Sequence, residues 1–177
     1  EEVNQAVDTI FRRSSVLVRF VENYRKVTGL PAPAVEIITV DSLLNSAVVL
    51  FKEKSDIVKI LPVTSHLQII ADKAMIEQIL INLIRNAVDA TQNCSEPSIE
   101  LSAGINAEGK TYIQVSDNGT GIPADVQERI FIPFFTTKPT GSGIGLSISR
   151  QIMHMHKGSL TVISETGQGS RFLLTFP

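Results

Sequence analysis

The sequence predicts an α/β protein: a two-layer sandwich in which a mixed sheet packs on helices, preceded by one long helix. Three observations predict this class. The first 28 residues contain neither Pro nor Gly. Beyond them, segments that read as strands and helices mix without strict alternation, which favours a mixed sheet over a doubly wound one. With 177 residues, 43% of them hydrophobic, the chain can bury a full core.

The first helix has an apolar seam whose residues are spaced alternately by four and three. The seam comprises Val3, Val7, Ile10, Ser14, Leu17, Val21 and Tyr24. This 3.5-residue period favours a coiled coil or helical bundle; an amphipathic helix packed on its own domain remains the alternative. Gly29, Pro31 and Pro33 end the helix and form a stiff connector. We therefore expect two domains, residues 1–30 and 31–177.

The body begins with a strand at residues 35–40, and Asp41 or Ser42 can cap a helix running to about Lys54. Two short strands follow, near 56–61 and 66–71. Asp72 then caps a long helix that extends to about Asn93. Strands are expected at 98–105 and 111–116, joined by a turn around Gly109.

Residues 118–142 are rich in Gly, Pro and Thr, with a short helix near 125–130. A loop of this length is usually functional, and we interpret it as a lid. A helix from about Gly143 to His156 follows. The chain closes with strands 159–165 and 170–176, which turn at Gly167 and Gly169.

Composition excludes several classes of protein. The net charge of −2 predicts no broad basic surface for nucleic acid. Cys94 is the only cysteine, so no internal disulfide can form, which fits a reducing compartment. No apolar run reaches the ~18 residues of a membrane span. The chain begins at Glu1 inside a helix, so we expect a fragment of a longer protein whose anchor or sensor lies elsewhere.

The long helix beginning after Asp72 carries polar residues on one stripe. Asn82, Asn86, Asp89 and Asn93 follow at four- and three-residue spacing. Asn is a poor helix former, so several on one stripe need a reason. An amide oxygen suits Mg²⁺, which binds few protein ligands and substrate phosphates. An ordinary solvated face explains the stripe equally well.

Two glycine motifs flank the lid. Asp117-Asn-Gly119-Thr-Gly121-Ile122 follows a strand, where Asp117 can accept a hydrogen bond from the exocyclic amine of a base; alone, it is also a common turn signal. Gly141-Ser142-Gly143-Ile144-Gly145-Leu146 opens a helix, whose free N–H groups favour phosphate. A flexible hinge is the alternative.

Between these motifs, three aromatic residues lie close to a cation. Phe131, Phe134 and Phe135 are expected to pin the lid to the body, because large aromatic side chains are costly when exposed. Thr137 and Lys138 follow them. Lys138 can then reach a terminal phosphate.

Together these motifs resemble, in order, the N, first glycine, F and second glycine boxes of bacterial sensor histidine kinases. The closing Gly167-Gln-Gly169-Ser170-Arg-Phe172 is similar to a final motif of that family. The resemblance covers about residues 35–177 and implies a Bergerat-type ATP-binding fold. It implies that Asn86 binds Mg²⁺, Asp117 reads adenine, Gly119 and Gly121 line the base pocket, and Gly141, Gly143 and Gly145 face the phosphates of ATP. Further nucleotide contacts are expected from Asp89, Ile122, Phe131, Thr137, Lys138, Ser142, Ile144, Leu146 and Ser170.

The family resemblance also separates kinase from ATPase. ATP-hydrolysing relatives carry a Glu one turn before the metal-binding Asn, whereas this chain has Asn82, whose amide cannot deprotonate water. We expect Asn82 and Lys138 to be catalytic, with Arg85 as a weaker candidate cation. The N-terminal helix is similar to the second helix of the family's dimerisation hairpin, and no context typical of the phosphoacceptor histidine surrounds His66, His154 or His156, which we expect to be ordinary surface or helix-end residues.

We therefore expect a cytoplasmic catalytic domain that transfers the ATP γ-phosphoryl to a histidine on a helix missing from this chain. The expected partners are that helix, a response regulator receiver domain, and a second copy in the full-length homodimer, with any membrane contact through absent segments. The alternatives are an anti-sigma-type protein serine kinase and a nucleotide-binding scaffold without activity.

Overall fold

The structure is a computed structural model that describes residues 29–63, 66–138 and 141–177, together with Phe11, Ser14, Val18 and Val21. The chain forms two compact units, Glu1–Pro31 and Ala32–Pro177. In the first unit Phe11, Ser14, Val18 and Val21 are helical and exposed. The predicted heptad seam lies outside the described residues except at Ser14 and Val21. Among the described residues, no helix combines the length and hydrophobicity that a bilayer crossing requires.

The second unit is a two-layer sandwich, as the sequence predicts. A five-stranded sheet has the order β2-β4-β5-β7-β6. The β2–β4 pair is parallel and the other pairs are antiparallel, so the sheet is mixed. The strands are β2 (Val58–Ile60), β4 (Ile99–Ile105), β5 (Thr111–Asp117), β6 (Ser159–Glu165) and β7 (Gly169–Thr175).

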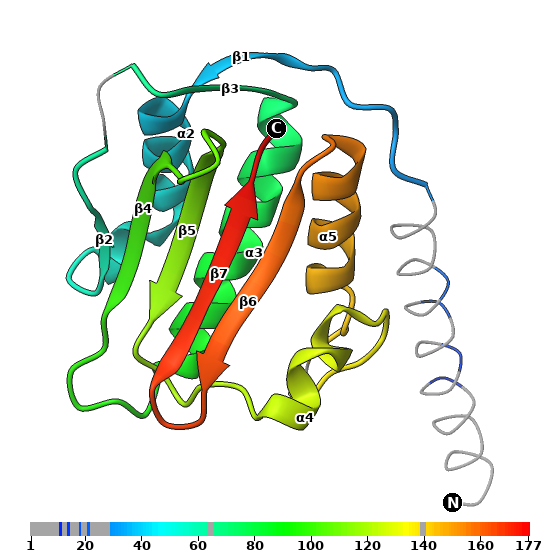
Figure 1. Cartoon of the computed structure of the whole chain (residues 1–177). Coiled ribbons are helices and arrows are strands. Elements are labelled where there is room, and N and C mark those ends of the chain that lie inside the picture. The colour runs from blue at the N-terminus through cyan, green and yellow to red at the C-terminus, as the bar shows by residue number, and fades with distance from the viewer. Residues whose placement is uncertain are drawn as a thin grey trace, which may run out of the picture. The chain divides into compact units, whose positions relative to one another are not determined.

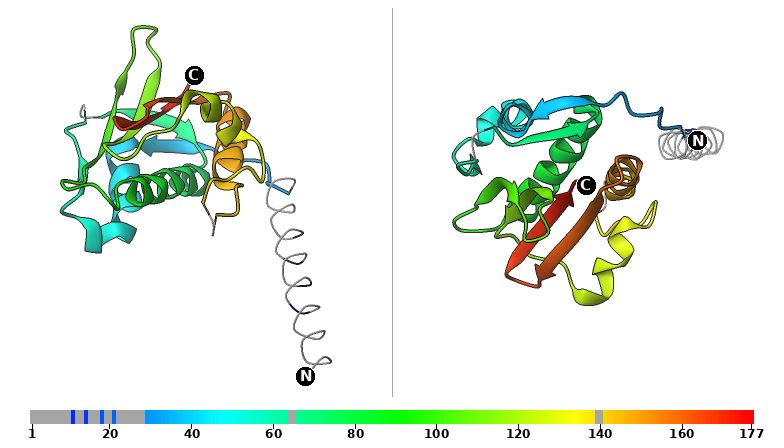
Figure 2. Two further views of the ribbon diagram at one scale, coloured as in Figure 1. Left: turned by 90° about the horizontal axis from the view of Figure 1, so that it is seen from below. Right: turned by 45° about the horizontal axis from the view of Figure 1, so that its top comes forward.

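Three helices cover one face of this sheet, as Figures 1 and 2 show. They are α2 (Val40–Val48), α3 (Lys73–Ala90) and α5 (Gly145–Met155). A separate antiparallel pair, β1 (Glu36–Thr39) and β3 (Gln68–Ala71), flanks them. The segment between β5 and α5 contains α4 (Ala124–Gln127) and the 3-10 turn η2 (Arg129–Phe131).

The core lies between the helices and the sheet. The predicted apolar face of α3 is buried at Ile76, Ile79, Leu80, Leu83 and Ala87, whereas Val88 is only half-buried. Burying such side chains contributes roughly 1.5–3 kcal/mol each. The opposing strand residues and the apolar face of α5 complete the core: Ile99, Leu101, Ile113, Val115, Phe172, Leu174, Ile148, Ile152 and Met153.

The start of α2 differs from the prediction. The helix begins at Val40 with Thr39 as its N-cap, so neither Asp41 nor Ser42 caps it. The Val40 N–H instead donates to the Leu67 carbonyl at 2.9 Å, which fixes the first turn where β1 meets the chain before β3. The α-helix ends at Val48, and the expected continuation to Lys54 is a 3-10 segment, η1 (Val49–Lys54).

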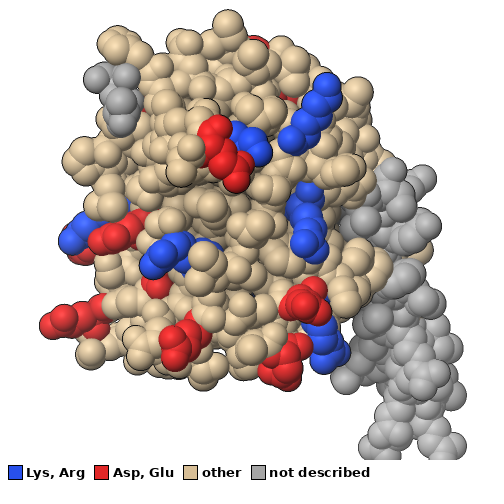
Figure 3. All heavy atoms as spheres, in the orientation of Figure 1, with Lys and Arg blue, Asp and Glu red and all other residues tan. Residues whose placement is uncertain are grey.

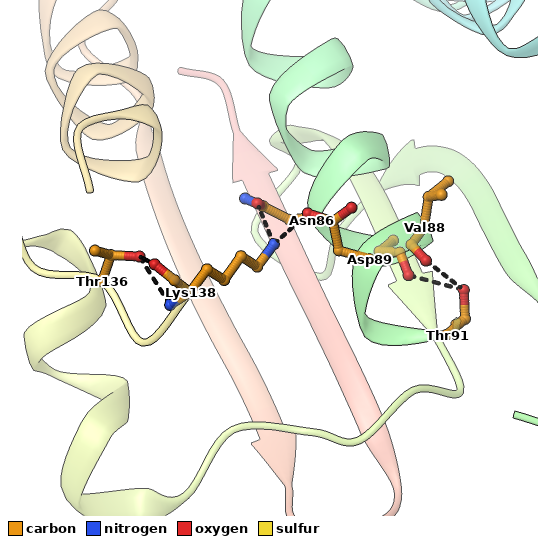
Figure 4. Close-up of polar contacts among 7 residues, drawn as sticks. Asn86, Val88, Asp89, Thr91, Thr136 and Lys138 are labelled. Atoms are coloured by element: carbon orange, nitrogen blue, oxygen red, sulfur yellow. Dashed lines mark hydrogen bonds and ion pairs between the residues drawn. The ribbon is translucent and has the colours of Figure 1, made fainter. Parts of the chain in front are cut away.

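Both ends of α3 have identifiable caps. Asp72 is the N-cap, as predicted, and its Oδ1 accepts the Met75 N–H at 3.1 Å. The helix ends at Ala90. The predictions that it extends to about Asn93, and that Asn93 belongs to its polar stripe, are therefore wrong. The Thr91 hydroxyl ends the helix by donating to the Ala87 carbonyl at 2.9 Å and to the Val88 carbonyl at 3.2 Å; Figure 4 draws the contact with Val88.

His66 departs from its predicted strand, whereas His156 lies at a helix end as expected. His66 lies in a turn with a positive φ of 70° before β3, not within the strand. His156 is the C-cap of α5, the helix-end position expected for it, and its side chain is buried. Its Nε2 accepts the Asp72 N–H at 2.9 Å and its Nδ1 faces the Ile152 carbonyl at 2.7 Å. The bond from Asp72 ties the end of α5 to the start of α3, and the contact with Ile152 lies within α5.

Candidate functional site

Three predicted site residues gather where the lid segment meets α3. The ammonium of Lys138 lies 2.6 Å from Asp89 Oδ2 and 3.2 Å from Asn86 Oδ1. Figure 4 shows the lysine reaching from the segment before α5 to the two oxygens on the helix. Asn86 and Asp89 are three residues apart, so helical periodicity places them on one face. An amide oxygen and a carboxylate therefore converge on one cation, which is a donor set that also suits Mg²⁺.

Asp117 ends β5 and turns the chain into the first glycine motif. Its Oδ1 accepts the Gly119 N–H at 2.9 Å. Burial raises the pKa of Asp117 above its ordinary value, and hydrogen bonds from the backbone of Gly119 and Ser170 partly offset that shift. A carboxylate kept at an energetic disadvantage is a feature of functional sites, because a ligand can supply the hydrogen bond that compensates it.

Glycines allow the loop after Asp117 to lie close to protein backbone. A Cβ on Gly119 would come within 2.6 Å of the Ala90 carbonyl oxygen, and one on Gly121, whose φ is +69°, would collide with the Glu165 carbonyl oxygen. The sequence suggested close approach to a ligand at these positions. The approach seen in the structure is to the end of α3 and to the β6–β7 hairpin.

A serine and a glutamine, neither singled out by the sequence, anchor this loop. The Ser164 hydroxyl accepts the Ile122 N–H at 2.8 Å and lies 3.0 Å from the Ser170 hydroxyl. Gln127 donates to the Ile122 carbonyl at 2.8 Å and to the Ser164 carbonyl at 2.7 Å. The sequence signal was weak, because Ser164 is one of several polar residues in a strand. Predicted residues Ile122 and Ser170 therefore belong to one hydrogen-bonded group beside Asp117.

Phe131, Phe134 and Phe135 are buried unequally. Phe131 is buried, with the Arg150 guanidinium 4.4 Å from its ring centroid. Arg129 lies at the same distance over Phe135, and such contacts stabilise by about 0.5–1 kcal/mol at exposed sites. Phe134 is 37% exposed, the most exposed of the three residues expected to pin the lid to the body. Its φ is +68°, and its N–H donates to the Gly143 carbonyl at 2.8 Å.

The second glycine motif lies against α3 through Asn82. Asn82 Nδ2 donates to the Ser149 hydroxyl at 3.2 Å, and a Cβ on Gly145 would collide with Asn82 Oδ1. The amide therefore fits the space that the absence of a side chain at Gly145 provides. The helix begins at Gly145 rather than at Gly143, because Gly143 has a φ of +67°, outside the helical region.

The remaining predicted residues differ in exposure. Thr137, Gly141 and Ser142 are exposed, Leu146 is half-buried, and Ile144 is buried. Arg85 is exposed on α3. Figure 3 shows the open face of the sheet, where charges of both signs are scattered rather than gathered in one field. The predicted ligand contacts of these residues stay predictions.

Comparison with known proteins identifies the fold's relatives. A family profile described as "Histidine kinase-, DNA gyrase B-, and HSP90-like ATPase" matches residues 71–177. The Escherichia coli K12 signal transduction histidine-protein kinase AtoS is 38% identical over 107 residues, covering 60% of this chain and 17% of its own length. The E. coli K12 sensor histidine kinase ZraS is 31% identical over 183 residues, covering 99% of this chain and 38% of its own length. The chain thus spans well under half of these relatives.

Solved structures show the same architecture. The nucleotide-free catalytic domain of the histidine kinase ThkA has a TM-score of 0.69 at 32% identity, covering 81% of this chain and 95% of that one. Full-length ShkA in complex with AMPPNP has a TM-score of 0.76 at 27% identity, and the match covers 100% of this chain and 39% of the ShkA chain. ThkA in complex with the response regulator protein TrrA has a TM-score of 0.72 at 27% identity, and the match covers 100% of this chain and 52% of that chain.

The family profile spans more than half of the chain, including Asn86, Asp117 and the second glycine motif. The mixed sheet with helices on one face is the architecture of the histidine kinase catalytic domains. The chain belongs to the histidine kinase-, DNA gyrase B- and HSP90-like ATPase family, as an ATP-binding domain of the sensor histidine kinase type.

Proposed function

We propose that this chain binds Mg-ATP and supplies the catalytic part of a two-component sensor histidine kinase. The observation that carries the proposal is the convergence of Asn86 Oδ1 and Asp89 Oδ2 on a single cation. Hard oxygen atoms in this arrangement fit Mg²⁺, which keeps several waters and shares its remaining ligands with phosphates. The kinase names of the relatives support the same reading.

Each part of the site has a distinct role in this proposal. Asn86, assisted by Asp89, holds the metal, and Asp117 accepts the hydrogen bond of the adenine amino group. Gly119, Gly121 and Ile122 shape the base pocket, and the second glycine motif presents N–H groups to the phosphates. Bound Mg²⁺ neutralises phosphate charge, which phosphoryl transfer requires more than it requires covalent help from the protein.

The reaction transfers a phosphoryl group to a histidine of a separate helix. A bond forms between an imidazole nitrogen and the γ-phosphorus, while the bond from that phosphorus to the β–γ bridging oxygen breaks and ADP leaves. Asn82 lacks the basicity to activate water, which disfavours competing hydrolysis. His156 is a poor acceptor, since it is buried with both ring nitrogens engaged.

The partners follow from this role. A response regulator receiver domain would take the phosphoryl group from the histidine, which the complex of ThkA with TrrA supports. The N-terminal helix, residues 1–30, would form part of the dimerisation hairpin of a homodimer. ATP as the substrate fits a cytoplasmic location for this part of the protein, with any membrane contact made by other segments.

Calorimetric titration with Mg-ATP tests binding. Asn86→Ala and Asp117→Ala should each weaken binding about tenfold or more, since each removes a contact to a charged group that contributes about 1.5–3 kcal/mol. Asn45→Ala, on an exposed turn of α2, and Asp56→Asn, in an exposed turn, are the matched controls. Equal affinity in all five proteins would refute the assignment of the site.

Phosphorylation of a supplied acceptor tests the activity. A dimerisation hairpin with its acceptor histidine, taken from ZraS, is incubated with this chain and radiolabelled ATP. The product should be acid-labile, as a phosphohistidine is. An acid-stable product would point to the serine kinase alternative, and binding without any transfer would point to the scaffold alternative.

A further inference from the structure

The contact of Lys138 with α3 differs from the other ion pairs in the described part of the chain. Those pairs are local: Lys73 with Glu77 within one helix, and Lys110 with Glu108 in one turn. Lys138 instead bridges 49 residues to Asp89 and 52 residues to Asn86. It therefore holds the lid segment, defined as residues 132–138 and 141–144, on α3.

The backbone around Lys138 is ordered for this contact. The Lys138 N–H donates to the Thr136 hydroxyl at 3.1 Å, and the Lys138 carbonyl accepts the Gly141 N–H at 3.1 Å. A Cβ on Gly141 would lie 2.5 Å from the Thr136 hydroxyl oxygen, so a side chain at this position would displace that hydroxyl from the Lys138 N–H. The bond to Thr136 fixes the Lys138 backbone, and the ammonium of the lysine lies on the two oxygens, as Figure 4 shows.

The ammonium and a divalent cation need the same atoms. Asn86 Oδ1 and Asp89 Oδ2 are the oxygens assigned above to the metal, and in this structure they bind Lys138 Nζ. Two cations on one pair of oxygens repel each other, and Mg²⁺ at its usual distance of about 2.1 Å from oxygen leaves no room for an ammonium on the same lone pairs.

We propose that Lys138 is an internal competitor for the metal site, which it occupies when no divalent cation is bound there. Arrival of the divalent cation displaces the ammonium from Asn86 and Asp89, and this releases the lid segment from α3. The freed lysine is then available to the phosphates that arrive with the metal. The inference rests on the proposed function for the identity of the metal, whereas the contact of Lys138 with Asn86 and Asp89 rests on its own distances.

The competition predicts faster amide exchange in the lid segment when the contact is broken. Hydrogen exchange of the Gly141 amide is followed by NMR in the nucleotide-free chain. The side chains of Lys138 and Asp89 are 43% and 38% exposed, and exposed pairs of this kind shift an equilibrium by about two- to fivefold. Asp89→Asn and Lys138→Met should each accelerate exchange by that factor, and the double variant should add nothing further.

Lys110→Met removes an equally close but local surface pair with Glu108, and it should leave Gly141 exchange unchanged. The amides in the buried part of α3 verify that each variant is folded. If the Gly141 amide exchanges at the wild-type rate in Asp89→Asn and Lys138→Met, the lysine does not hold the lid segment. The same conclusion follows if the effects of the two substitutions add fully in the double variant.

Mg²⁺ without nucleotide provides the second arm. Compared with KCl at equal ionic strength, it should accelerate Gly141 exchange in the wild type and have no such effect in Lys138→Met. An equal response in both proteins would overturn the competition. Calorimetry with Mg-ATP on the same wild-type sample tests the proposed function separately from the competition by Lys138. If ATP does not bind, the proposed function is contradicted, and the exchange results still decide whether Lys138 holds the lid segment.

Discussion

Replacing Asp117 with Asn should weaken nucleotide binding and stabilise the folded protein at the same time. The amide keeps an acceptor oxygen for the Gly119 N–H, which the carboxylate now accepts at 2.9 Å, so the loop can persist. What changes is charge. A hydrogen bond to a charged group contributes about 1.5–3 kcal/mol and a neutral one about 0.5–1.5. The loss of about 1 kcal/mol corresponds to an affinity for Mg-ATP lower by about fivefold.

The stability of the variant should depend on pH with a defined sign. Because burial raises the folded-state pKa of Asp117 above 3.8, the native state holds this proton more tightly than the unfolded state. The free energy of unfolding of the wild type therefore falls as pH rises from about the unfolded pKa through the folded pKa. Asp117→Asn lacks this titration, so its advantage over the wild type should grow across that window and then level off.

Urea unfolding at several pH values, with calorimetry of Mg-ATP binding, measures both effects. Asp56→Asn, an exposed aspartate, is the control and should change neither. A variant that binds ATP as tightly as the wild type would refute the adenine role of Asp117. A stability difference that shrinks as pH rises would refute the claim that burial disfavours its charge.

Three further substitutions test the fold around the site, each by urea unfolding. Gly121→Ala should destabilise by more than Gly109→Ala, because both have positive φ but only Gly121 would collide with the Glu165 carbonyl; the φ strain alone is about 1–2 kcal/mol. Asp72→Ala should cost about 1 kcal/mol at neutral pH through loss of the N-cap, whereas Asp72→Asn should cost less. Hydrogen bonds from Ala34 and Met75 lower the pKa of Asp72, so this stability is present above pH 3.8 and is lost as pH falls through the lower, folded-state pKa. His156→Ala should cost about 2–4 kcal/mol, since it leaves a cavity and an unpaired Asp72 N–H; a cost below 1 kcal/mol would contradict the role given to this bond.

The sequence predicted best those elements that local rules determine. Helix α3 followed from its apolar spacing and from the Asp72 cap, and the β4–β5 pair followed from the turn at Gly109. Helix starts were less predictable where tertiary contacts decide them. Thr39 precedes α2 because Val40 bonds to Leu67, a residue far along the chain, and no local signal at Asp41 reveals this.

The sequence indicated which residues belong to the candidate site, but not which of their side-chain atoms contact each other. Asn86, Asp89, Asp117 and Lys138 were all singled out from their motifs. Which atom binds which depends on segments about 50 residues apart, as in the contact of Lys138 with Asp89. Gly119 and Gly121 were predicted to lie close to a ligand, and their neighbours in the structure are protein backbone atoms, which spacing alone could not distinguish from a ligand.

An amide NMR titration with Mg-AMPPNP measures most directly whether nucleotide lies between Asp117 and Asn86. Nucleotide in this position should produce saturable shifts at the backbone amides of Gly119 and Ser170 and at the side-chain amide of Asn86. Titration without Mg²⁺ should retain the shifts near Asp117 and lose the one at Asn86. Shifts confined to the open face of the sheet, or no saturable shift at all, would contradict the account.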